Sequence, residues 1–417
     1  MFLSEYQDDF IRQVNLAKKG DVPMIPNPYG RMSDNFNLMP SRYTLIFGAT
    51  GSGKTSFADF TYVLKPLEYI KESIANNRIK DEDLHYEVVY FSLERKKLFK
   101  YAKFMSYFLY RDHGYQIPAD HLLGWGGPNI GTMSEELYKL VRSYDLEMET
   151  LLDHIVLYDG GITKDTLISA VTERALKLGT LYRVENNAVF RTVGKECKLV
   201  ASKTRTIDTK RGQITVHDIT HTNKYGTQKF YLEEGKHKFI PDKTQTYLYV
   251  VVDGINLLGS KEVIDEVSTT LANLRDIYGC SPVVVSQQNR DQASSGRSQP
   301  GKSLEPKLED IFKSSQMSFD ADLVLALFDP DRYRAYNSKG IYNGYQIVPG
   351  PIVQGSMQAP QGNSRFRSCH ILKNNFGFDN AVYGMKFLGE SNYFELLPKP
   401  SEDDKLLDIY QKIANGF

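Results

Sequence analysis

A short glycine-rich segment carries the clearest chemical pattern in the sequence. The residues from Gly48 to Thr55 read Gly-Ala-Thr-Gly-Ser-Gly-Lys-Thr and match the pattern G-x-x-x-x-G-K-[ST]. An apolar run precedes this segment and a helical pattern follows it, so it lies where a strand turns into a helix. The glycines let successive backbone N–H groups surround a phosphate, Lys54 supplies charge, and the Thr55 hydroxyl can hold Mg²⁺. The pattern predicts a nucleoside triphosphate site formed by Gly48, Gly51, Ser52, Gly53, Lys54, Thr55 and Ser56.

Three polar residues at the ends of apolar runs could complete such a site. The apolar run Tyr247–Asp253 ends in a carboxylate. In nucleoside-triphosphate sites, an Asp at the end of such a strand supports the metal through water. An Asp at a strand end can also be a simple cap, but beside a phosphate loop we predict a metal role for Asp253. Glu94 could be the base that activates a water, or a surface residue before a basic stretch. Gln287 could sense the γ-phosphate, or be an ordinary polar residue leaving the sheet.

The elements that must position these residues alternate along the chain. Between the apolar runs, the clearest helix is predicted over Lys261–Tyr278, where apolar residues recur at steps of three and four. Strands that alternate with helices predict an α/β fold, with a mostly parallel central sheet flanked by helices on both faces. The predicted strands are Tyr43–Phe47, Val88–Ser92, Ile155–Tyr158, Tyr247–Val252, Pro282–Ser286 and Leu323–Phe328.

Residues 185–245 interrupt this alternation and predict a β-rich insertion. Lys210-Arg211-Gly212 is typical of a hairpin turn between two strands. From Lys195 to Lys243 the segment holds 11 Lys or Arg against 6 Asp or Glu. This surplus fits a solvated hairpin face better than a dedicated nucleic-acid arm, and both interpretations stay open. The alternating stretches are Ala188–Val193, Thr204–Thr209, Gln213–Ile219 and Lys229–Glu233.

The same patterns divide the whole chain. We expect a core over residues 41–184 and 246–400, interrupted by the insertion at 185–245. Residues 1–40 are expected to form an N-terminal helix, over Tyr6–Ala17, and a linker rich in Pro, Gly and Asn. Residues 401–417 are expected to form a C-terminal helix or tail. The irregular stretch from Asp329 to Ser364 predicts a long loop that is either functional or disordered.

Composition excludes several classes of protein. The 417 residues include 51 Lys+Arg and 51 Asp+Glu, so any surface that binds nucleic acid must be local. No run of about 18 apolar residues predicts a membrane-spanning helix, and the polar N-terminus does not have the pattern of a secretory signal. Cys197, Cys280 and Cys369 lie far apart without the spacing of metal ligands. Free cysteines favour a reducing, cytoplasmic location.

Taken in order, these segments resemble the DnaB-like replicative ring helicases, which belong to the RecA-like P-loop ATPases. The resemblance covers roughly residues 25–185 and 246–397. It implies a RecA-like homo-hexamer that hydrolyses ATP with Mg²⁺ and moves along single-stranded DNA during replication. A primase or a loader would be a further partner. Besides the phosphate loop, the similar stretches are Phe91–Glu94, Val252–Leu258, Val284–Arg290 and Asp310–Asp322.

The chain also departs from the family pattern. Only about 40 residues precede the core, so we expect no primase-interaction domain ahead of it, and the insertion is an addition. A short chain of this kind suggests a phage or mobile-element protein that acts in the host cytoplasm.

The resemblance assigns roles to individual residues. It implies that Glu94 is the catalytic base and Gln287 the γ-phosphate sensor. The loop that holds single-stranded DNA in the family corresponds here to Lys313, Ser314 and Ser315.

One position of the family's trans-acting site departs from the pattern. Lys373 matches the first residue of a basic pair that reaches the neighbouring subunit's nucleotide, but Asn375 stands where the arginine finger is expected. Lys373 alone could supply this charge, Arg365 or Arg367 could replace it, or turnover could be slow. Two alternative functions therefore stay open. One is a RecA-like recombinase or recombination mediator, and the other is a weakly hydrolysing, nucleotide-gated DNA-binding or virion component.

Overall fold

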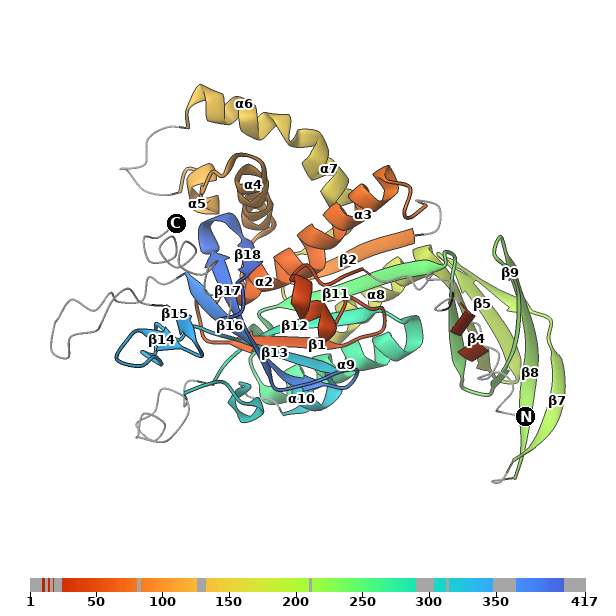
Figure 1. Ribbon diagram of the computed structural model, residues 1–417. Helices are drawn as coiled ribbons and strands as arrows, with labels where there is room; N and C mark the ends of the chain where they lie inside the picture. The colour runs from red at the N-terminus through yellow and green to blue at the C-terminus, as the bar shows by residue number, and fades with distance from the viewer. Residues whose placement is uncertain are drawn as a thin grey trace.

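The centre of the molecule is a nine-stranded sheet (Figure 1), in the order β18-β17-β16-β13-β1-β12-β11-β2-β3. The computed structural model describes residues 25–80, 84–125, 133–209, 212–289, 304–312, 315–347 and 365–400, with Phe10, Ile11, Val14, Asn15 and Lys18. The six strands from β13 to β3 are parallel, and β16, β17 and β18 continue the sheet in antiparallel fashion. The predicted α/β fold with a mostly parallel sheet is confirmed. The strands are β1 (Thr44–Gly48), β2 (Leu84–Ser92), β3 (Ile155–Tyr158), β11 (Gln245–Asp253), β12 (Ser281–Gln287), β13 (Leu323–Phe328), β16 (Phe366–Asn374), β17 (Ala381–Leu388) and β18 (Tyr393–Leu396).

The central strands are continuous apolar runs because helices cover both faces of the sheet. Every residue of β1 and β13 is buried, and Val283, Val284 and Val285 of β12 pack alternately on the two sides. Strands β3 and β13 have the predicted bounds, whereas β2 and β11 begin earlier. Their first residues, Leu84 and Gln245, pair with each other.

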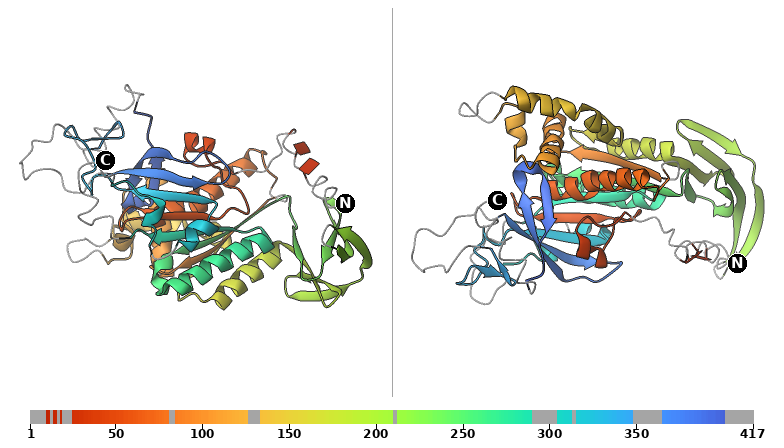
Figure 2. Two further views of the ribbon diagram at one scale, coloured as in Figure 1. Left: turned by 90° about the horizontal axis from the view of Figure 1, so that it is seen from below. Right: turned by 45° about the horizontal axis from the view of Figure 1, so that its top comes forward.

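Two layers of helices enclose the sheet (Figure 2). Helices α2, α3, α4 and α7 contribute to the core on one face, and α8, α9 and α10 to the core on the other. Helix α9 has the predicted bounds; the Ser260 hydroxyl caps its start and Gly279, at φ +68°, ends it. The helices are α2 (Lys54–Asp59), α3 (Lys65–Ala75), α4 (Lys97–His113), α5 (Ala119–Leu122), α6 (Glu135–Ser143), α7 (Asp145–Asp153), α8 (Lys164–Leu178), α9 (Lys261–Tyr278) and α10 (Gln316–Asp320).

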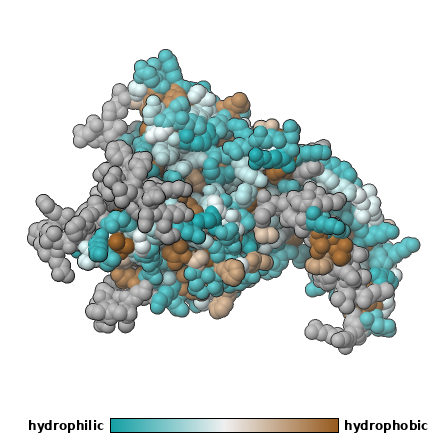
Figure 3. Space-filling model, viewed as in Figure 1, coloured by the Kyte–Doolittle hydropathy of each residue, from teal (hydrophilic) through white to brown (hydrophobic). Residues whose placement is uncertain are grey.

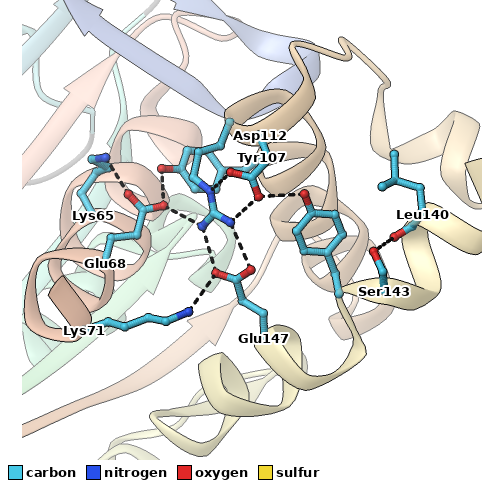
Figure 4. A network of polar contacts seen from close by, with 10 residues as sticks. Lys65, Glu68, Lys71, Tyr107, Asp112, Leu140, Ser143 and Glu147 are labelled. Carbon is cyan, nitrogen blue, oxygen red and sulfur yellow. Dashed lines mark hydrogen bonds and ion pairs between the residues drawn. The ribbon is translucent and has the colours of Figure 1, made fainter. Parts of the chain in front are cut away.

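A polar network fixes α4 against its neighbours (Figure 4). On α3, the Glu68 carboxylate accepts hydrogen bonds from the Tyr107 hydroxyl at 2.7 Å and from the Arg111 guanidinium at 3.1 Å. Arg111 also donates to Glu147 of α7 at 3.0 Å. Burial alone would lower the pKa of Arg111, but its bonds to three carboxylates raise it above its usual value. The network holds α4, which carries residues near the phosphate loop, in one position relative to α3 and α7.

The segment before the first strand is part of the core. Ile25 and Leu38 pair in an isolated bridge, and a 3₁₀ turn spans Gly30–Asp34 between them. Over residues 25–38 the segment expected as a linker packs on the core, since Tyr29 stacks on Phe57 of α2 and the other apolar side chains are buried in the same core. Most of the predicted helix Tyr6–Ala17 lies outside the described residues, as do 401–417. The side chains buried in the segment are Ile25, Tyr29, Met32, Phe36 and Leu38.

The β-rich part forms two antiparallel sheets that project from one end of the molecule (Figures 1 and 2). One sheet has the order β10-β4-β5-β6 and the other β7-β8-β9. Their facing sides enclose a small apolar core that includes Tyr182, Val189 and Phe230. Strand β4, which the sequence assigned to the ATPase core, pairs within this part. The strands are β4 (Gly179–Glu185), β5 (Ala188–Val193), β6 (Glu196–Val200), β7 (Lys203–Thr209), β8 (Gly212–Asn223), β9 (Gly226–Glu233) and β10 (His237–Pro241).

The surface in view is largely hydrophilic, with apolar residues in small separate patches (Figure 3). Among the described helices, none is long and apolar enough to cross a membrane. Within the long loop predicted after Asp329, a short hairpin is formed by β14 (Ile341–Tyr342) and β15 (Tyr345–Gln346), and residues 348–364 lie outside the described part.

Candidate functional site

The phosphate loop connects β1 to α2, as the sequence predicts. Gly48 ends the strand, and a Cβ added there would lie 2.3 Å from the Leu327 carbonyl oxygen of the neighbouring strand. Gly53 precedes the helix at φ +94°, and a Cβ there would lie 2.9 Å from the rings of Phe387 and Phe394. Both contacts are too close for any side chain, so glycine is required at these two positions. The loop amides are thereby held at the N-terminus of α2, where a phosphate group is stabilised.

Lys54 begins α2 and lies over the loop. Its ammonium donates a hydrogen bond of 2.9 Å to the Ala49 carbonyl oxygen. Burial lowers the pKa of Lys54 to about 8, and the nearby Glu94 and Asp253 carboxylates oppose that shift. The cation and both carboxylates thus lie within electrostatic reach of one another, although they come from three separate segments.

Thr55 and Asp253 meet at the ends of two parallel strands. The Thr55 hydroxyl donates a hydrogen bond of 2.8 Å to Asp253 Oδ1. Asp253 is the last residue of β11 and is fully buried. Because β1, β12 and β11 are parallel neighbours, their carboxyl ends bring the phosphate loop and this carboxylate together.

The Thr55–Asp253 pair fits a Mg²⁺ ion of the kind that accompanies bound phosphates. Such an ion takes one or two protein oxygens and completes its shell with phosphate oxygens and water. Among the residues that the structure describes, no group of three or more His, Cys, Asp or Glu could hold a metal by itself. A hydroxyl and a carboxylate at the loop therefore match a nucleotide-associated ion better than a protein-enclosed one.

Glu94 and Gln287 face the same cavity as the loop. Glu94 is exposed at the end of β2, and a Cβ added to Gly254 would lie 2.6 Å from its Cγ, so Gly254 leaves space for this side chain. Gln287 ends β12 beside Gly48, and its backbone N–H donates to Asn256 Oδ1 at 2.6 Å. A cavity of about 270 Å³ joins these groups; it is lined by Thr50, Gly51, Gly53, Lys54, Thr55, Ser56, Glu94, Arg95, Phe99, Lys100, Lys103 and Gln287.

Three buried residues beside the site, Lys100, Asp59 and Tyr90, are absent from the sequence prediction. Lys100 of α4 is 1% exposed, and its ammonium contacts Asp59, Tyr90 and Asp253. Burial alone would lower the pKa of Lys100, but the two carboxylates reverse this and hold it above its usual value. Only one sequence signal could have revealed the group, namely a lysine on the apolar face of an amphipathic helix.

Two arginines, one after β13 and one on β16, contact the loop of their own chain. Arg332 donates to the Thr50 carbonyl oxygen. Arg367 forms an ion pair of 3.1 Å with Asp329 and lies 3.5 Å from the Gly51 carbonyl oxygen. Burial lowers the pKa of Arg367. The structure therefore places Arg367 against the phosphate loop of its own chain.

The structure does not bring Lys373 to the phosphate loop of the same chain. Lys373 lies on β16, and its ammonium donates to the carbonyl oxygens of Ser318 at 2.9 Å and Ala321 at 2.6 Å, at the end of α10. Asn375 donates to the Asp322 carboxylate at 3.2 Å. Arg365 pairs with Glu390 at 3.1 Å.

The predicted DNA loop is described only in part. Asp310 and Ile311 are buried, and Phe312 is half-buried. Lys313 and Ser314 lie outside the described residues, as does the stretch from 290 to 303. Ser315 is exposed and directly precedes α10, whose far end contacts Lys373.

Comparison with known proteins finds solved structures of similar fold. No protein-family model and no curated protein matches the sequence. The solved structure of the ATPase domain of G40P is similar at 15% identity and a TM-score of 0.56, covering 95% of this chain and 99% of that one. A DnaB-like replicative helicase, described with its interactions with primase, is similar at 15% identity and a TM-score of 0.51, covering 92% of this chain and 67% of that one. The chain therefore has a fold similar to that of the ATPase domain of G40P and to that of a DnaB-like replicative helicase, in line with the resemblance seen in the sequence.

Proposed function

We propose that this protein hydrolyses ATP with Mg²⁺ and uses the energy to move along single-stranded DNA as a replicative ring helicase. The observation that carries the proposal is that Lys54, Thr55 and Glu94 line one cavity, and that the buried Asp253 carboxylate directly behind it accepts a hydrogen bond from Thr55. Each residue comes from the carboxyl end of a parallel strand or the loop after it, where α/β folds bind their ligands.

The arrangement supports a division of chemical roles among these residues. The loop amides and Lys54 neutralise the phosphate charge, and Thr55 and Asp253 hold Mg²⁺, which supplies further charge stabilisation when bound. Glu94 accepts the proton of the attacking water, since it is an exposed carboxylate at the mouth of the same cavity. Gln287 lies between the loop and Asn256, where it can report the state of the γ-phosphate to β12.

Assembly into a homo-hexamer would complete the site. A ring motor positions a cation of the neighbouring subunit at the charge that develops on the γ-phosphate. The subunit that binds ATP is therefore not the subunit that completes the catalytic site. Lys373 is the residue proposed for this role, and Lys313, Ser314 and Ser315 are proposed to hold the DNA backbone. Because Lys373 contacts α10 and Ser315 precedes that helix, one short element links the two proposed sites. A primase or a loader is the proposed further partner.

Unwinding of a forked DNA substrate tests the proposal directly. The wild-type chain is expected to release the labelled strand with ATP and Mg²⁺, but not with ADP or in EDTA. The Lys54→Ala variant is the matched control and should release none. ATP-independent strand release, or none under any condition, would reject the helicase assignment.

One observation favours a second candidate, a weakly hydrolysing, nucleotide-gated DNA-binding component. Lys373 donates to backbone carbonyl oxygens of α10, and Arg365 is paired with Glu390. Each of these two cations would have to leave its partner before it could act on a neighbouring subunit. This candidate predicts ATP-dependent DNA binding without unwinding, and the forked substrate separates the two functions.

A further inference from the structure

A fully buried charge cluster lies directly behind the proposed metal site. Lys100 projects from α4 and is 1% exposed, and Asp59 and Asp253 are both 0% exposed. Burying one ammonium and two carboxylates is costly unless each is paired and hydrogen-bonded. Beside a reactive site, an arrangement of this kind points to a task other than packing.

Asp59 follows Thr55 by one helical turn, so the two side chains project from the same face of α2. The Tyr90 hydroxyl donates to Asp59 Oδ1 at 2.7 Å, and Asn392 donates to Asp59 Oδ2 at 3.4 Å. Asp59 is therefore fixed from β2 and from the turn before β18, and the Tyr90 hydroxyl lies closer to Asp59 than to Asp253 Oδ2, which is 3.5 Å away.

The ammonium of Lys100 lies between the two carboxylates but closer to Asp59. Its Nζ is 2.9 and 3.1 Å from the two oxygens of Asp59, and 3.3 Å from Asp253 Oδ2. The other Asp253 oxygen, Oδ1, accepts the bond from Thr55. Two carboxylates and one ammonium together carry a net charge of −1. Because Lys100 lies farther from Asp253 than from Asp59, this negative charge lies mainly on Asp253.

We propose that Asp59 and Lys100 act as a positioning pair that sets the affinity of the Asp253 site for Mg²⁺. Asp59 holds the ammonium, which orients Asp253 through Oδ2 without forming a tight ion pair that would compete with the metal. Without the Asp59 charge, Lys100 would pair fully with Asp253 and oppose Mg²⁺ binding by direct charge competition. This inference rests on the proposed nucleotide site and adds the control of its metal affinity.

The proposal predicts an unusual rescue between two variants. Asp59→Asn is expected to raise the Mg²⁺ concentration for half-saturation about tenfold, the usual scale for residues that support a metal ligand. Adding Lys100→Met removes the competing ammonium, so Asp59→Asn/Lys100→Met should return within about twofold of wild type. A merely structural role predicts the opposite order, with the double variant at least as impaired as the single one.

The measurement is equilibrium binding of a fluorescent ADP analogue, titrated with Mg²⁺ and followed by anisotropy without turnover. The matched control is Glu87→Gln. This variant removes a carboxylate of β2 that accepts a hydrogen bond from Arg174 at 2.8 Å, and it should not shift the titration. In Asp59→Asn, Lys100 retains Asp253 as a partner, so folding is expected; melting temperatures check it. If that variant does not fold, Asp59→Glu keeps the charge but weakens its hold, and a smaller rise is expected.

The outcomes separate this inference from the proposed function. A wild-type chain that binds no ADP analogue with Mg²⁺ contradicts the nucleotide site itself. A wild-type chain that binds it, with an unshifted Asp59→Asn or Asp59→Glu titration, overturns only the positioning role. A double variant no better than Asp59→Asn overturns it as well.

Discussion

Thr55 and Asp253, which are 198 residues apart in the sequence, share a hydrogen bond of 2.8 Å at the carboxyl edge of the sheet. The contact aligns a helix N-terminus with the end of β11, and it fixes both oxygens that the proposed Mg²⁺ ion would use. A site assembled in this way depends on sheet register, since β11 reaches β1 only through β12.

The phosphate-loop cation is expected to be indispensable. Lys54→Ala removes the only lysine of the loop, so binding of a fluorescent ATP analogue should weaken by at least about 10²-fold and phosphate release should disappear. Lys71→Ala, at an exposed lysine on α3, is the control and should behave as wild type. Turnover close to wild type in Lys54→Ala would contradict the assignment of the loop.

The proposed base can be separated from binding. Glu94→Gln keeps the shape and hydrogen-bonding capacity of the side chain but cannot accept a proton. We expect ATP binding to be retained and hydrolysis to fall by about 10²-fold or more, measured in single-turnover experiments. If hydrolysis persists at the wild-type rate, another group activates the water and Glu94 is only a surface residue at the end of β2.

A buried histidine predicts how stability depends on pH. Burial lowers the pKa of His370 to about 4, and its Nε2 lies 2.9 Å from the Ser368 hydroxyl. Between pH 6.5 and 4 the unfolded chain takes up a proton at this residue and the folded chain does not, so stability falls as pH falls through that window. The contribution is at most about 1.4 kcal/mol per pH unit.

The pH dependence can be assigned to this residue by substitution. His370→Gln cannot titrate, so its melting temperature should fall less steeply than that of the wild type between pH 6.5 and 4.5. His121→Gln, at an exposed histidine, should leave the wild-type slope unchanged. Equal slopes for wild type and His370→Gln would show that other groups dominate the acid response.

Exposed aromatic residues near Lys373 predict where subunits meet. Phe319, Phe376 and Phe378 are 74%, 63% and 80% exposed, and Lys373 donates to the Phe319 carbonyl oxygen at 3.4 Å. Exposed aromatic side chains are typical of interfaces, and a trans-acting Lys373 would have to lie at one. Phe378→Ser is therefore expected to lower the assembled mass seen by light scattering with ATP, whereas Leu146→Ser, also exposed, should not. Unaltered assembly would place the interface elsewhere.

The sequence predicts the site far better than it predicts the surroundings of the site. Motif residues such as Lys54 and Asp253 follow local rules, because a phosphate loop and a strand-end carboxylate each occur in a short continuous segment. The burial of Lys100 depends on how α4 packs against α2 and β2, and the place of this lysine on the apolar face of an amphipathic helix is its one local sign. Packing of residues 25–38 on the core is equally hard to predict, since Pro, Gly and Asn indicate turns but do not reveal that intervening apolar residues are buried.

The trans role of Lys373 is the strongest test of the ring mechanism. Its ammonium donates to the carbonyl oxygens at the end of α10, so in the proposed trans role it would exchange these bonds for a phosphate of the neighbouring subunit. Lysine offers a point charge without the fork of an arginine, so slow turnover is expected even in the wild type.

Lys373→Met keeps the aliphatic stem and should leave ATP binding nearly intact while removing DNA-stimulated hydrolysis. Mixing it with Lys54→Ala subunits should restore some activity, because interfaces that combine an intact loop with an intact Lys373 then form. Normal hydrolysis by Lys373→Met, with only a lowered melting temperature, would make Lys373 a helix cap and favour the weakly hydrolysing candidate.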